Sequence, residues 1–286
     1  MKKVILVVGM HRSGTSALTG TLVEAGAAFG DTALAAGGRP ENPLGLVERT
    51  DFMALSERAL RLLGCSWHDL SEFRPNWDNE QAASIRENFR NTVLADLLKH
   101  EVSILKDPRL CFLLPLFLPA IPNPAAVLIV RHPGEVALSL QARNGFPLPF
   151  GVALWEAYNR QALLSLQNVP GILVHHRRLL RDTANCIEEL VAGLARLDVR
   201  GLNAEAAVGH IRPMLHHHRG ADAAETYELS RGQRRFWRQL RDATELAGLV
   251  PGELSAESAE ALRLHHINPI LPLRRGKASP GKGSAS

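Results

Sequence analysis

The stretch GMHRSGTS, residues 9–16, has the spacing of a nucleotide phosphate loop but lacks its lysine. The usual pattern is G-x-x-x-x-G-K-[ST], and here Thr15 follows the second glycine, Gly14, where the lysine would stand. In ATP sites that lysine reaches the β- and γ-phosphates, and the hydroxyl after it helps to hold Mg²⁺. The stretch therefore predicts an anion site for a nucleotide with a single 5′-phosphate group, which needs neither the lysine nor a metal.

The segments around this loop predict a strand before it and a helix after it. Residues 4–8 are wholly apolar, as in a strand buried on both faces, and the helical pattern of residues 14–26 ends near Gly26. Backbone N–H groups and the positive end of such a helix bind phosphate. We expect the nucleotide to be held by His11, Arg12, Ser13, Gly14, Thr15 and Ser16.

Apolar runs and helical patterns alternate along the rest of the chain. Strands are predicted at 102–106, 125–130 and 171–176. Helices are predicted at 50–64, at 80–99, from Pro133 onward, and over most of the chain between the last strand and residue 265. Strands separated by helices are typical of an α/β fold with three layers. We expect a mostly parallel sheet flanked by helices, with the phosphate-loop unit at its N-terminus.

Length and composition are those of an ordinary globular chain. A chain of 286 residues can bury about 75% of its unfolded surface, so we expect residues 1–272 to form one domain, followed by a flexible basic Gly/Ser-rich tail at 273–286. The net charge of +4 favours an anionic ligand, but with 5% aromatic residues it argues against a nucleic-acid partner. The three cysteines lack disulfide or zinc spacing, and no stretch approaches the roughly 20 apolar residues of a membrane span. We expect a cytoplasmic protein.

Three motifs, in order, resemble those of the sulfotransferases that use 3′-phosphoadenosine-5′-phosphosulfate (PAPS). GMHRSGTSAL resembles their 5′-phosphosulfate loop, in which Arg12 would be the basic residue before Ser-Gly-Thr. VLIVRHPGEVALSL resembles their 3′-phosphate motif, a strand ending in arginine (Arg131) with a serine eight residues later (Ser139). ILKDPRL resembles the Lys-Asp-Pro segment of the tyrosylprotein and related sulfotransferases, whose lysine, here Lys106, faces the leaving-group side of the sulfate.

Two departures from the family indicate which branch the chain resembles. The cytosolic branch uses a histidine base where this chain has Pro108, and it closes over the donor with a Gly-Asp-Trp-Lys segment that is absent here. The chain therefore resembles the bacterial and Golgi-type branches, in which a glutamate shortly after the first helix is the base. Glu41 and Glu48 are both available. We favour Glu48, because the predicted helix 50–64 can anchor it.

The resemblance implies a sulfotransferase that moves the sulfuryl group of PAPS in line to an acceptor hydroxyl of a carbohydrate, a lipid or a small metabolite. Glu48, Lys106 and Arg12 would be catalytic, Arg131 and Ser139 would bind the donor, and no metal is expected. Two alternatives remain open. One is a degenerate phosphate-loop kinase using Mg·ATP, for which Asp107 is the near candidate as magnesium ligand, and the other is a nucleotide-binding protein without catalysis.

The acceptor site and the oligomeric state stay open in the sequence. Residues 28–47 and 65–79 are the expected walls of the acceptor pocket, where Trp67 and Trp77 could stack on a ring. The cluster His216–His218 is more typical of a solvated turn or anion contact than of a metal site. A basic helical stripe, expected to be a solvated face, consists of Arg231, Arg234, Arg235, Arg238 and Arg241.

Overall fold

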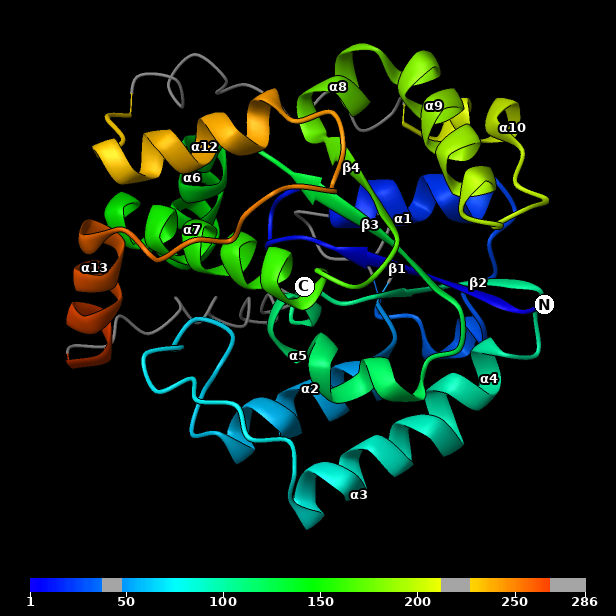
Figure 1. Ribbon diagram of the computed structural model, residues 1–286, viewed down its shortest axis with the longest axis horizontal. Coiled ribbons are helices and arrows are strands. Elements are labelled where there is room, and N and C mark those ends of the chain that lie inside the picture. The colour runs from blue at the N-terminus through cyan, green and yellow to red at the C-terminus, as the bar shows by residue number, and fades with distance from the viewer. Residues whose placement is uncertain (38–47, 212–226, 268–286) are drawn as a thin grey trace, which may run out of the picture.

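The computed structural model describes residues 1–37, 48–211 and 227–267 (Figure 1). In this part of the chain, four strands form one sheet in the order β2-β1-β3-β4, and each neighbouring pair is parallel. The strands are β1 (Lys3–Val8), β2 (Val102–Lys106), β3 (Pro124–Val130) and β4 (Gly171–His175). All four coincide with apolar runs that predicted strands, so the predicted α/β class with a parallel sheet is confirmed.

The central strand β1 explains why helices cover both faces of the sheet. Val4, Leu6 and Val8 pack into one apolar cluster, whereas Ile5 and Val7 pack into another. Successive side chains of a strand point to opposite faces, so a strand that is apolar throughout must be covered on both sides. The three-layer arrangement follows from this pattern and is confirmed.

The helices divide between the two faces (Figure 1). The cluster around Ile5 and Val7 is covered by α1 (Thr15–Glu24), α8 (His176–Arg181), α9 (Thr183–Arg196) and α10 (Ala204–Ile211). The cluster around Leu6 is covered by α2 (Thr50–Leu62), α3 (Glu80–Phe89), α5 (Leu110–Phe117), α6 (Pro133–Asn144), α7 (Leu148–Ser165) and α12 (Arg231–Asp242). Helix α13 (Ala256–Ile267) packs on α7.

Two helical predictions need correction in detail. The helix expected at 80–99 is divided, because a π-helical segment, Arg90–Leu94, lies between α3 and the short α4 (Ala95–Leu97). The long helical region expected after β4 is a series of separate helices in the described residues. Helix α12 begins with a capping box in which the side chains of Ser230 and Gln233 each accept a backbone N–H of the other residue.

Parallel pairing brings the carboxyl ends of the strands to one edge of the sheet. From β1 the chain first adds β2 on one side, and from β2 it crosses to add β3 on the other side of β1. The order of strands therefore reverses beside β1, and ligands of open α/β sheets bind at such a point, outside the carboxyl ends. The loop after β1 and Arg131 after β3 both lie at this position.

Candidate active site

The loop between β1 and α1 is a tight turn that depends on its two glycines. A Cβ atom at Gly9 would lie 2.7 Å from the carbonyl oxygen of Ile129 on β3, and one at Gly14 would overlap the ring of His176. Gly14 also has φ of +91°, which side chains disfavour, and Arg12 has φ of +69°. With positive φ at both Arg12 and Gly14, the backbone makes a tight turn directly before α1, as the loop pattern predicts.

The first turn of α1 has donors available for an anion. Gly14 stands at its N-cap position and supplies no side-chain cap, so the first N–H groups of the helix have no partner of that kind. The hydroxyl oxygen of Ser13 is buried and has no hydrogen-bond partner among the described residues. A buried hydroxyl without a partner beside a positive helix end fits a phosphate or sulfate group bound there.

The structure brings Arg12, Arg131 and Ser139 together at this loop. Arg12 donates from Nε to the hydroxyl of Ser139 over 2.8 Å, and Arg131 donates from Nη1 to the backbone carbonyl of Arg12, also over 2.8 Å. Arg131 directly follows β3, and Ser139 lies on α6. The arginine and serine spaced eight residues apart therefore meet the loop in space, although 119 or more positions separate them from it in sequence.

Lys106 and Glu48 form a buried ion pair on the other side of the loop. The Nζ atom of Lys106 lies 2.6 Å from Oε1 of Glu48 and 3.0 Å from the hydroxyl of Ser16. Lys106 ends β2 next to Val7 of β1, and Glu48 lies two residues before α2 begins. The carboxylate expected to be the base, the lysine and the first turn of α1 are thus in direct contact.

Asp107 is held by Arg109 and takes no part in this contact. Its carboxylate accepts from the backbone N–H of Arg109 over 2.8 Å and from the guanidinium over 2.9 and 3.1 Å. Arg109 also donates to Glu57 of α2. Burial raises the pKa of Asp107, and the positive charge of Arg109 opposes that rise. Asp107 therefore caps the turn after β2.

His11 faces aromatic side chains beside the loop. Its ring centroid lies 4.7 Å from that of Trp67 and 5.7 Å from that of Tyr158, and its Nε2 atom is buried with no hydrogen-bond partner in the described residues. Burial, and then the charges of Arg143 and Arg109, hold the pKa of His11 well below its usual value, so the ring is neutral at pH 7.

Of the two tryptophans expected near the acceptor, only Trp67 meets the site residues directly. The guanidinium of Arg143 lies 5.2 Å from its ring centroid, which is within reach of a cation–π contact. Both tryptophans pack against the apolar cluster around Leu6, and the backbone carbonyl of Trp77 accepts from Arg86 of α3. The wall expected at 65–79 therefore meets the loop at Trp67.

A cavity of about 370 Å³ opens beside Arg131 and adds residues that sequence reasoning did not assign to the site. It is lined by the ends of β3 and β4, by α8 and by α12. Besides Arg131, its arginines are Arg177, Arg178, Arg181 and Arg241. Of these five, Arg131 is paired with Glu135 of the same lining, Arg178 with Glu189 and Arg241 with Asp242. The lining is therefore rich in arginine, and most of its guanidinium groups already have carboxylate partners.

The expected basic stripe is exposed on α12, as a solvated face would be, and its last member, Arg241, reaches the cavity. Phe236 and Leu240 are buried on the opposite side, whereas Trp237 also lines the cavity and meets His132 edge to face at 5.2 Å. A signal for the other wall was present in the sequence: HHRR, residues 175–178, spans the end of the strand predicted at 171–176, and ligand-binding residues of α/β folds gather at such strand ends.

Glu41, His216–His218 and the tail at 273–286 lie outside the described residues. Within residues 1–37, 48–211 and 227–267, no three His, Cys, Asp or Glu side chains gather where they could hold a metal ion. In the same ranges no helix combines the length and apolar character needed to cross a bilayer.

Comparisons with known proteins give similarity at the level of solved structures. No protein-family model matches the sequence, and no curated protein is similar to it. Three solved structures that the chain resembles are sulfotransferases. One is the sulfotransferase domain of the curacin biosynthetic pathway, at 14% identity and a TM-score of 0.47, over 93% of this chain and 98% of that one.

The other two solved structures come from Synechococcus PCC 7002 and Mycobacterium avium. The sulfotransferase domain of the olefin synthase of Synechococcus PCC 7002 is 16% identical with a TM-score of 0.48, over 93% of this chain and 94% of that one. The sulfotransferase STF9 of Mycobacterium avium is 13% identical with a TM-score of 0.48, over 88% of this chain and 79% of that one.

Proposed function

We propose that the chain is a sulfotransferase that moves the sulfuryl group of PAPS to an acceptor hydroxyl. The observation that carries this proposal is the contact of Lys106 with both the carboxylate of Glu48 and the hydroxyl of Ser16. It joins a buried carboxylate, a buried cation and a phosphate-type loop within one set of hydrogen bonds. A group transfer between oxygen atoms uses three such parts. They are a general base, a positive charge that stabilises the leaving group, and hydrogen-bond donors that bind the anion.

The residues present fit a nucleotide that has a 5′-phosphosulfate and a 3′-phosphate. Ser13, the start of α1 and Arg12 would hold the 5′ end, because buried and uncapped donors meet there. Arg131 and Ser139 would hold the 3′-phosphate, and the arginine-rich cavity beside Arg131 would take the nucleoside. Its volume of about 370 Å³ lies in the range of small-ligand pockets.

The chemistry then assigns one task to each side chain. When bound, PAPS supplies a sulfuryl group joined to a 5′-phosphate that leaves as part of 3′,5′-adenosine bisphosphate. Glu48 accepts the proton of the acceptor hydroxyl, a contribution of about 10²–10⁴ in rate for general bases. Lys106 and Arg12 stabilise the negative charge that grows on the leaving oxygen, and they are already oriented by Glu48, Ser16 and Ser139.

The kinase alternative is weakened by the position of Asp107. A Mg·ATP site beside this loop would need a carboxylate free to hold the metal, and the near candidate is bound on both oxygens by Arg109. Thr15 also stands where the lysine that reaches the γ-phosphate belongs. Neither feature conflicts with a nucleotide that has one phosphate at its 5′ end.

The test is the formation of 3′,5′-adenosine bisphosphate from PAPS in the presence of carbohydrate, lipid and small-alcohol acceptors. We expect at least one acceptor to accelerate bisphosphate release by the wild-type protein, and Glu48→Gln to abolish that acceleration while it still binds bisphosphate. A protein that binds the bisphosphate but releases none above the rate without protein, with every acceptor, would be a nucleotide-binding protein without catalysis.

A further inference from the structure

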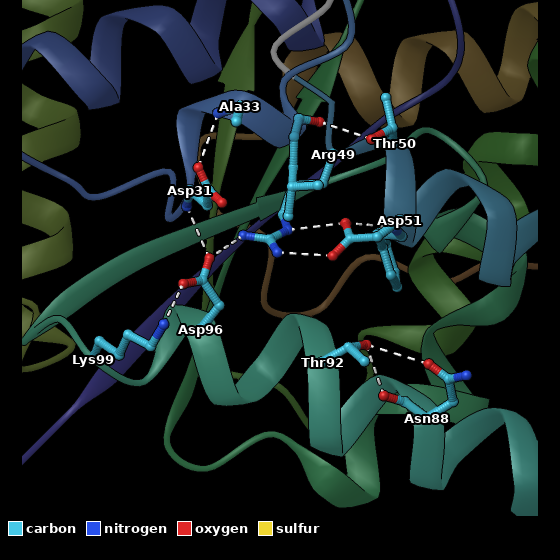
Figure 2. A network of polar contacts seen from close by, with 11 residues as sticks. Asp31, Ala33, Arg49, Thr50, Asp51, Asn88, Thr92, Asp96 and Lys99 are labelled. Atoms are coloured by element: carbon cyan, nitrogen blue, oxygen red, sulfur yellow. Dashed lines mark hydrogen bonds and ion pairs between the residues drawn. The ribbon is translucent and has the colours of Figure 1, made fainter.

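Arg49, the residue directly after Glu48, forms a buried ion cluster that no step of the proposed reaction uses (Figure 2). Its side chain is 2% exposed, and its guanidinium donates to both oxygens of Asp51 over 3.1 and 2.8 Å and to Oδ2 of Asp96 over 2.5 Å. Removing a charged group from water costs several kcal/mol, so a buried arginine persists only where partners satisfy it. Here both partners are in place.

The cluster joins three segments that are distant in sequence. Asp96 lies on α4, where it also accepts from the backbone N–H of Asp31 over 2.8 Å and from Lys99 over 3.1 Å, as Figure 2 shows. Gly30 packs so closely that a Cβ atom there would overlap both Arg49 and Asp96. The segment 30–31, the residue before α2 and helix α4 are therefore held together at one point.

The backbone at Glu48 is fixed on both sides of its side chain. The carbonyl oxygen of Glu48 accepts from the N–H of Ala36 over 2.8 Å, and the Thr50 hydroxyl donates to the carbonyl of Leu34 over 3.1 Å. Arg49 between them is extended, with φ of −83° and ψ of 128°. Side chains of successive extended residues point to opposite sides, so the carboxylate of Glu48 reaches Lys106 while the guanidinium of Arg49 reaches Asp96.

We propose that Arg49 is a positioning residue, which holds the carboxylate of Glu48 against Lys106 through its pair with Asp96. The role of Glu48 as base rests on the proposed function, whereas the positioning itself does not. Catalytic groups displaced by about 1 Å can lose about 10²-fold in rate. Arg49→Met, which removes the charge and keeps the length, should therefore lower kcat by about 10²-fold and leave the KM for PAPS within about twofold.

Arg49→Lys keeps one charged donor and should recover part of kcat, because one pair with Asp96 can still form. Asp96→Asn is the second variant, in case Arg49→Met does not fold, and it should lower kcat in the same direction. Lys99→Met is the matched control, since it removes the exposed partner of the same carboxylate, 70% exposed, without touching Arg49. It should leave both constants unchanged.

A readout independent of turnover separates the two proposals. The side-chain ammonium of Lys106, labelled with ¹⁵N and assigned with Lys106→Arg, should give a slowly exchanging NMR signal that is lost in Glu48→Gln. Loss or shift of that signal in Arg49→Met and Asp96→Asn, with unchanged binding of 3′,5′-adenosine bisphosphate, supports positioning by Arg49. An unaltered signal in both folded variants overturns it. Failure of the wild-type protein to bind the bisphosphate would instead overturn the proposed function alone.

Discussion

Lys106 donates from Nζ to Oε1 of Glu48 over 2.6 Å, and the two side chains are 1% and 8% exposed. The pair joins the end of β2 to the segment before α2, and its lysine also reaches Ser16 at the start of α1. The proposed base and its cationic partner are thus held together beside the loop that is proposed to bind the anion. Most of the expected chemistry depends on this pair.

Breaking this pair from one side should destabilise the fold. Lys106→Met leaves the carboxylate of Glu48 buried without its partner, and removal of one member of a buried pair costs about 3–5 kcal/mol. The free energy of unfolding, measured by urea denaturation, should fall by that amount. The double variant Glu48→Gln/Lys106→Met should lose clearly less than the sum of the two single variants. Strictly additive losses would mean that the two groups do not interact in solution.

Arg131 should distinguish nucleotides by their 3′-phosphate. A hydrogen bond to a charged group contributes about 1.5–3 kcal/mol, so Arg131→Ala should raise the Kd for 3′,5′-adenosine bisphosphate by about 10- to 100-fold. The Kd for 5′-AMP, which lacks the 3′-phosphate, should change much less. Ser139→Ala should act in the same direction with a smaller effect. Equal losses for both nucleotides, measured by calorimetry, would remove Arg131 from the 3′-phosphate site.

Within the basic stripe, Arg241 should contribute to nucleotide affinity, whereas its neighbour Arg238 should not. Arg241 lines the cavity beside Arg131, whereas Arg238 is exposed on the same helix and does not line it. Arg241→Ala should raise the Kd for the bisphosphate several-fold, and Arg238→Ala should leave it unchanged at the same salt concentration. Equal effects of the two substitutions would indicate a general electrostatic attraction rather than a contact in the cavity.

The stability of the fold should decrease on mild acidification because of His68. Burial, followed by the charge of neighbouring His265, lowers the pKa of His68 to about 4, and Asp69 opposes this shift. In the unfolded chain the pKa returns to about 6.5, so between these values the unfolded state binds a proton that the native state does not. The contribution is complete above about pH 6.5 and is lost as the pH falls toward 4. His265, also with a lowered pKa, acts in the same direction.

Urea denaturation at pH 7.5, 6 and 5 measures this effect. His68→Phe should flatten the decline between pH 6.5 and 5, because the aromatic contacts with Trp67 and Phe146 can persist without a titrating group. His100→Gln, which replaces an exposed histidine, serves as the control and should follow the wild-type profile. An identical pH dependence in His68→Phe and the wild-type protein would contradict the assignment.

The features of the site that depend on residues close together in the chain could be predicted from the sequence. Short apolar runs predicted all four strands. The spacing of Gly9 and Gly14 predicted the loop between β1 and α1. The spacing of Arg131 and Ser139 also sufficed, because one strand end and two turns of the following helix bring them to one side.

Long-range contacts account for what the sequence could not show. Arg241 meets Arg131 in one cavity only because α12 returns to the ends of β3 and β4, and no spacing rule predicts that return. The π-helical segment Arg90–Leu94 interrupts a regular pattern of apolar residues that predicted one helix. The burial of Arg49 depends on its pair with Asp96, which is 47 positions away and which no local pattern predicts.

The most direct test of the central claim is ligand selectivity in a thermal-shift titration with 3′,5′-adenosine bisphosphate, 5′-AMP and Mg·ATP. At 100 times its Kd a ligand stabilises the native state by about 2.7 kcal/mol, which a melting curve resolves. We predict a clear shift with the bisphosphate, a much smaller one with 5′-AMP at equal concentration, and loss of the bisphosphate shift in Arg131→Ala. Stabilisation by Mg·ATP but not by the bisphosphate would contradict the sulfotransferase proposal.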